Sequence, residues 1–180
     1  MSYFLRNRVA IDAASKIGGV CLLIFYVAQY SVEIFRTNQR DALSASISYI
    51  KRFADAEILD ARLALLAFWG DRANLAQLAV SGTLSSESFG YAMLTELEMA
   101  PETLARLNRI GYFFDELYYC KESRICNSEV VERFFCPHAI GYERTYFHFL
   151  RESEAQIIGR DLYIGVKGLS ELCVSTRPPA

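Results

Sequence analysis

Three cysteines and a histidine in the second half of the chain have the residue types of a transition-metal site. Cys120, Cys126, Cys136 and His138 follow the spacing C-x5-C-x9-C-x-H. Thiolates and imidazole nitrogens are ligands that zinc accepts. Structural zinc sites, however, usually pair their cysteines across two to four residues, and five intervening residues do not make such a knuckle. We therefore expect buried cysteines that pack as small apolar side chains, with zinc binding as the alternative.

A thiol nucleophile is the second chemistry that these residues suggest. His138 follows Cys136 by two residues, and Pro137 stands between them. A reactive thiol needs a lowered pKa and a base that faces it, and the bend at the proline turns the two side chains apart. The hypothesis of a thiol- or metal-dependent enzyme or sensor is kept as an alternative, and no catalytic residue and no cofactor are predicted.

Two adjacent carboxylates, Asp115 and Glu116, are the polar residues of this region that we most expect to have a specific role. Neighbours on a helix point about 100° apart, so the two rarely share one site. We expect a structural contact with Arg144, Arg133 or Tyr142 instead.

No other catalytic pattern occurs in the sequence. His148 lies among aromatic residues and is interpreted as a packing residue. The sequence contains no Glu-x-x-His pair, phosphate-binding loop, nucleophile elbow or dinucleotide fingerprint.

These residues belong to a chain of 180 amino acids, of which 52% are hydrophobic. That length suits one domain with an added segment. The formal net charge is −2, so no general positive field indicates a nucleic-acid partner. The composition also excludes a disordered chain and a collagen-like one.

The apolar residues are concentrated near the amino end. Residues 17–28 read IGGVCLLIFYVA, and no charge occurs between Lys16 and Glu33. A transmembrane helix needs about 20 apolar residues, so this stretch is short but close. Arg6 and Arg8 would suit a signal peptide, but the sequence YVAQYS is a poor cleavage site. A buried core helix is the other alternative, and we predict a retained single-pass membrane anchor.

Two weaker signals predict on which side of the membrane the rest of the chain lies. Basic residues flank the stretch almost equally, with Arg6, Arg8 and Lys16 before it and Arg36 and Arg40 after it. The five cysteines form an odd set without a regular framework, which favours a reducing compartment. The sequence therefore predicts an inner-membrane protein whose residues beyond about 35 are cytoplasmic.

Polar side chains at the end of the apolar stretch share one helical face. Tyr26, Gln29 and Glu33 recur at three- and four-residue steps. Tyr30, Thr37 and Arg40 continue the stripe. The stripe is either an interfacial helix end or a face that packs on a partner helix. Tyr26, Gln29 and Glu33 are the predicted partner contacts.

The remaining sequence predicts an all-α protein. Residues 1–35 would be the anchor segment, 36–56 an amphipathic stalk, 57–174 a helical domain and 175–180 a flexible tail. Expected apolar stripes are Leu43, Ile47, Ile50 and Ala54 in the stalk, and Leu59, Leu63 and Leu66 after it. Further helices are expected over 73–80, from Ser85 or Ser86 to 99, 101–119, 128–136 and 137–151. Residues 162–166 are the only strand candidate.

The second half of the chain resembles an uncharacterised bacterial family of single-span membrane proteins with a small cytosolic helical domain of unknown function. The resemblance lies in LNRIGYFFDELYYC (107–120), SEVVERFF (128–135) and IGYERTYFHFL (140–150). Phe113, Phe114, Asp115, Glu116 and Leu117 match the first motif, Val131, Phe134 and Phe135 the second, and Tyr142 and Tyr146 the third. The resemblance implies the topology and the fold, but no activity. The cysteines at 120, 126 and 136 do not belong to its pattern.

These observations predict a non-enzymatic accessory, scaffold or interaction subunit. Its partners would be the lipid bilayer and a membrane or membrane-proximal protein, with a homo-oligomer as a further possibility and without nucleic acid. A self-associating membrane effector is the third hypothesis, after the thiol or metal enzyme.

Overall fold

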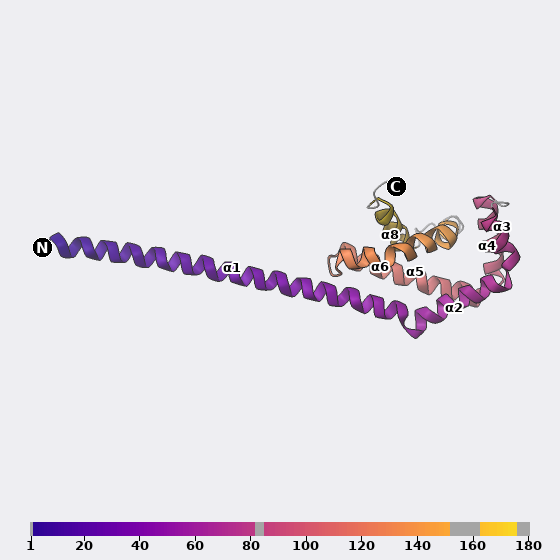
Figure 1. Cartoon of the computed structure of the whole chain (residues 1–180), viewed down its shortest axis with the longest axis horizontal. Helices are drawn as coiled ribbons and strands as arrows, with labels where there is room; N and C mark the ends of the chain where they lie inside the picture. The colour runs from indigo at the N-terminus through magenta and orange to yellow at the C-terminus, as the bar shows by residue number, and fades with distance from the viewer. Residues whose placement is uncertain (1, 82–84, 152–162, 176–180) are drawn as a thin grey trace. The chain divides into compact units, whose positions relative to one another are not determined.

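A computed structural model describes residues 2–81, 85–151 and 163–175, and residues 2–21, 76, 79, 80 and 86 are described by their backbone alone. This part of the chain is all-α, as the sequence predicts, and contains no strand (Figure 1). Its elements are α1 (Ser2–Ala54), α2 (Ala56–Asp71), α3 (Ala73–Val80), α4 (Ser86–Glu98), α5 (Pro101–Glu122), α6 (Ser128–Tyr142), the π-helix η1 (Glu143–Phe147) and α8 (Ile164–Ser175). Among the described residues, no helix combines the length and the apolarity needed to cross a membrane.

The chain divides into two compact units, Met1–Asp41 and Ala42–Ala180. The first consists of helix α1 up to Asp41, and the second contains the last residues of α1 together with α2 to α8. The predicted continuity of the apolar stretch with the stalk is confirmed, because α1 runs without interruption to Ala54.

Three predicted helix starts are confirmed, and each has a local cause. The Oγ of Ser85 accepts a hydrogen bond from the backbone N–H of Ser88 at 3.1 Å, which caps α4. Pro101 occupies the first turn of α5, where its missing N–H costs nothing. The Oδ1 of Asn127 accepts from the N–H of Val130 at 3.1 Å and caps α6.

An aromatic core fills the second unit. Helix α5 packs against α2 and α8, and α6 also packs against α8. The largest aromatic side chains of this core are fully buried, namely Phe53, Phe113, Phe114, Phe135 and Phe147. Their rings meet edge to face or tilted, at centroid distances such as 5.4 Å between Phe53 and Phe113.

Two predicted apolar stripes are wrong. In α2 the buried residues are Ile58, Ala61, Leu65 and Phe68, whereas Leu59, Leu63 and Leu66 are exposed. The end of α1 buries Ser46 and Phe53. Of the predicted stripe only Ile50 is partly buried against the core, while Leu43, Ile47 and Ala54 lie at the surface. Helix α2 carries apolar residues on two sides, and packing on α5 selects only one of them.

The predicted helix start at Pro137 is also wrong. Pro137 lies inside α6 and does not start a new helix. A proline removes the bond to the carbonyl four residues earlier, but Arg133 and Pro137 are both exposed, so water can reach that carbonyl. The strand candidate 162–166 begins outside the described residues, and its described part leads into α8. The predicted tail lies outside the described residues apart from Ser175, which ends α8.

Candidate interaction surface

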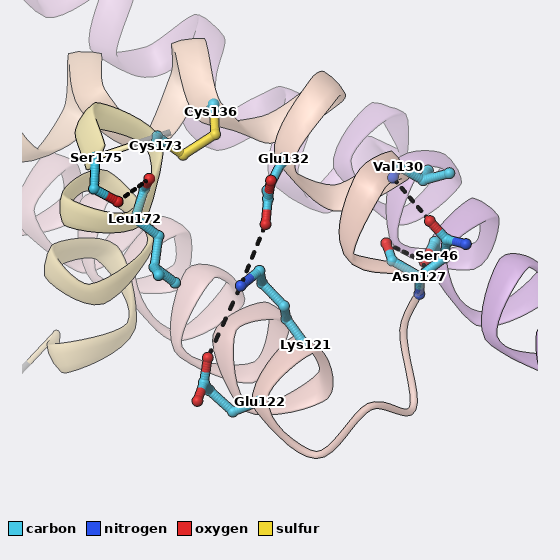
Figure 2. Close-up of polar contacts among 10 residues, drawn as sticks. All are labelled: Ser46, Lys121, Glu122, Asn127, Val130, Glu132, Cys136, Leu172, Cys173 and Ser175. Carbon is cyan, nitrogen blue, oxygen red and sulfur yellow. Dashed lines mark hydrogen bonds and ion pairs between the residues drawn. A yellow bond between two sulfur atoms is a disulfide. The ribbon is translucent and has the colours of Figure 1, made fainter. Parts of the chain in front are cut away.

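The four residues of the candidate metal set do not form one site. Cys120 is joined to Cys126 by a disulfide with a Cα–Cα distance of 5.3 Å. A second disulfide joins Cys136 of α6 to Cys173 of α8, at 5.5 Å (Figure 2). His138 lies against an aromatic ring instead, 4.9 Å from the centroid of Phe53. In the described residues no group of three or more His, Cys, Asp or Glu side chains could hold a metal ion.

Cysteine parity is the sequence signal that could have indicated these two pairs. The whole chain has five cysteines, which is an odd number. One of them, Cys21, lies in the apolar stretch, and the other four form two disulfides. The inference of a reducing compartment from an odd, unpaired set therefore loses its basis.

The Cys120–Cys126 disulfide closes the turn that brings α6 onto the end of α1. Within this turn the N–H groups of Ile125 and Cys126 both donate to the carbonyl of Cys120, at 3.0 Å. The next residue, Asn127, donates its backbone N–H to the Oγ of Ser46 at 2.8 Å (Figure 2). Ser46 is fully buried, and its hydroxyl also donates to the carbonyl of Ala42 at 3.0 Å, so the hydroxyl is satisfied both as a donor and as an acceptor.

Asp115 and Glu116 have separate structural roles. Asp115 lies at the start of α8, where its Oδ1 accepts the backbone N–H of Gly165 at 2.6 Å. Burial raises the pKa of this carboxyl, and the N–H donors and Arg151 partly oppose the rise. Glu116 forms an exposed ion pair with Arg52. The expected contacts with Arg144, Arg133 or Tyr142 were therefore wrong.

A second polar cluster surrounds Arg62. Its guanidinium lies 4.5 Å from the ring centroid of Phe53. Burial raises the pKa of Tyr142, and the nearby Arg62 partly opposes the rise. Burial lowers the pKa of His138, and the positive charge of Arg62 lowers it further. Burial likewise raises the pKa of Tyr146 to about 12, although its hydroxyl accepts a hydrogen bond from the indole N–H of Trp69. These groups are polar parts of the aromatic core, held in place by neighbouring rings.

One polar cavity of about 390 Å³ opens beside α8. Its lining residues are Glu143, His148, Arg151, Lys167, Ser170 and Glu171. Arg151 forms a two-pronged ion pair with Glu143, and Lys167 lies 4.0 Å from Glu171. The charges of the cavity are thus matched within the wall, which leaves no excess charge to recruit an ion. His148, predicted as a packing residue, is exposed on this wall.

The predicted contact face lies on α1. Tyr26, Gln29 and Glu33 are all exposed there, and Phe25, Val32 and Arg36 flank them. The hydroxyl of Thr37 donates to the carbonyl of Glu33 at 2.9 Å, so this donor is already used within the helix. The face therefore combines exposed apolar and aromatic side chains with one amide and one carboxylate.

The chain matches no protein-family profile, no curated protein and no solved structure. The resemblance to a bacterial single-span family consequently remains a prediction from the sequence.

Proposed function

We propose that the protein is a non-enzymatic, single-pass membrane protein whose helical domain serves as an accessory or interaction subunit. The proposal takes from the resemblance to the bacterial single-span family only the single span and the helical fold, and not the side of the membrane. The helical architecture and the exposed surface of α1 support it, and the partner is a membrane protein that packs on the Tyr26, Gln29 and Glu33 face.

The observation that carries the proposal is the run from Leu22 to Phe25. Four consecutive residues cover nearly the whole circumference of a helix, because each is turned about 100° from the last. All four are large and apolar, and their exposed fractions are 61–71%. A helix that is apolar on every side is stable only when its whole circumference is covered, and acyl chains provide that cover.

The polar face adds a reason for a protein partner. Gln29 and Glu33 follow this apolar run on the same side of α1 as Tyr26. An amide or a carboxylate close to the hydrocarbon is costly unless another group satisfies it. A neighbouring transmembrane helix supplies such groups, and water at the headgroups is the competing source.

Membrane attachment is tested by substitution within the run. We expect the natural chain to remain in the membrane pellet after alkaline extraction, and the Leu23→Glu/Ile24→Glu variant to be released. The matched control is Leu63→Glu/Leu66→Glu, which makes the same change at two exposed residues of α2. Release of the control together with the variant, or retention of both, would contradict the anchor.

The contact face is tested by photocrosslinking in intact membranes. A photoreactive residue at Gln29 or Glu33 should give the same discrete protein adduct. The controls are Ser31 and Asn38, which lie roughly 160–180° around the helix from Gln29. Adducts of twice the chain's mass would indicate a second copy as the partner. Equal adducts at all four positions would show that no such face exists.

A further inference from the structure

The positions of the two disulfides indicate on which side of the membrane the helical domain lies. Both pairs lie in the unit Ala42–Ala180, and every cysteine of that unit is paired. The remaining cysteine, Cys21, belongs to the apolar stretch. Structural disulfides persist in oxidising compartments and are rare where glutathione and thioredoxin keep thiols reduced.

Both pairs also hold elements of the core together. Cys136 and Cys173 connect α6 to α8 across a sequence separation of 37 residues (Figure 2). Cys120 and Cys126 fix the turn that presents Asn127 to Ser46. Cys120, Cys126 and Cys173 are buried. Both Cα–Cα distances fall within the range that a disulfide spans without moving the backbone.

We infer that the helical domain folds on the oxidising, extracytoplasmic side of the membrane, as a substrate of a thiol-oxidising enzyme of that compartment. For each pair, two S–H bonds break and one S–S bond forms. The two electrons and two protons convert the disulfide of the oxidising enzyme to a dithiol. This inference uses the proposed anchor to define the two sides, and it replaces the cytoplasmic placement expected from the sequence.

The charges beside the apolar stretch do not oppose this orientation. Arg6, Arg8 and Lys16 precede it, and Arg36 and Arg40 follow within about 20 residues, so the two flanks are almost equally basic. The orientation therefore rests on the two disulfides.

The test counts free thiols in the full-length chain. Bacterial cells expressing it are quenched in acid, denatured and treated with a maleimide-linked polyethylene glycol, with and without prior reduction. We expect one adduct without reduction, from Cys21, and five after it. The Cys21→Ser variant should give none without reduction and four after it. In cells that lack the extracytoplasmic thiol oxidase, the natural chain should give five adducts without reduction.

Fractionation of the same samples separates this inference from the proposed function. A chain in the membrane pellet with five adducts before reduction would overturn the extracytoplasmic placement and leave the anchor intact. A chain in the soluble fraction with one adduct would overturn the anchor and leave the disulfides intact. Three adducts in the pellet would overturn one pair, which the Cys120→Ser/Cys126→Ser and Cys136→Ser/Cys173→Ser variants identify.

A reporter fused after Ala180 gives a second readout that does not depend on the cysteines. Alkaline phosphatase folds to its active form only outside the cytoplasm, whereas green fluorescent protein that is exported unfolded stays dark and fluoresces only inside. We expect an active phosphatase fusion and a dark fluorescent one. The opposite pair of results would overturn the inference.

Discussion

The carboxylate of Asp115 on α5 accepts the backbone N–H of Gly165 at 2.6 Å, so one helix caps the start of another that follows 50 residues later. This contact requires a close approach of the two backbones. A Cβ on Gly165 would lie 2.3 Å from the Cα of Asp115 and 2.7 Å from the carbonyl oxygen of Phe114. Glycine at position 165 is therefore a packing requirement.

We expect Gly165→Ala to lower the free energy of unfolding by about 1–3 kcal/mol, because the backbone of α5 or α8 must move. Gly141→Ala is the control, since nothing lies within 4 Å of a Cβ built at Gly141. That variant should be neutral or more stable by up to about 1 kcal/mol, because alanine favours a helix. Denaturant titration followed by circular dichroism measures both, and equal effects would contradict the close approach.

The two disulfides should differ in their contribution to stability. In the chain-entropy account, a cross-link stabilises more when it closes a longer loop. With separations of 37 and 6 residues, removing Cys136–Cys173 should cost about 4 kcal/mol and removing Cys120–Cys126 about 2 kcal/mol. Thermal unfolding of the two double serine variants in detergent tests this order. The reverse order would show that native packing outweighs loop closure.

The ion pair of Glu143 and Arg151 should matter more than that of Glu116 and Arg52. The first pair is only 13% exposed on each side, whereas the second is about half exposed. Glu143→Gln leaves a mostly buried guanidinium without its counter-charge and should cost about 3 kcal/mol or more. Glu116→Gln should cost at most about 1 kcal/mol. Chemical denaturation compares them, and equal losses would contradict the difference in burial.

Acid should destabilise the helical domain through His138. Its pKa is lowered in the folded protein, first by burial and then by Arg62, so the folded state resists protonation. The unfolded chain takes up that proton as the pH falls below about 6.5, and stability is then lost. The melting temperature of the natural chain should fall more between pH 7.5 and 5 than that of His138→Gln. Parallel curves would rule out this contribution.

The sequence predicted the helical class and the starts of α4, α5 and α6, because each start depends on nearby residues. The prediction failed where the local sequence allows more than one helix face to be buried. Helix α2 offers two apolar stripes, and only the tertiary contact with α5 distinguishes Leu65 from Leu66.

Pairing of the cysteines was missed for a related reason. Cys136 and Cys173 lie on different helices, and their distance depends on how α6 packs against α8. Sequence spacing alone does not define connectivity among several cysteines. The sequence also did not predict that Asp115 accepts the N–H of Gly165 at the start of α8, because this contact depends on how α5 packs against α8.

The π-helix at Glu143–Phe147 marks a place where the length of the chain can change by one residue. A π turn holds an extra residue compared with an α turn, and here it accompanies burial of both Tyr146 and Phe147. Loss of one residue from this turn would restore α geometry, and the side chains that follow would keep nearly the same direction, because the widened turn already absorbs the extra residue. Phe149 and Leu150 would then stay in the interior. Related chains should therefore accept a single-residue gap at this turn more readily than elsewhere in the helix.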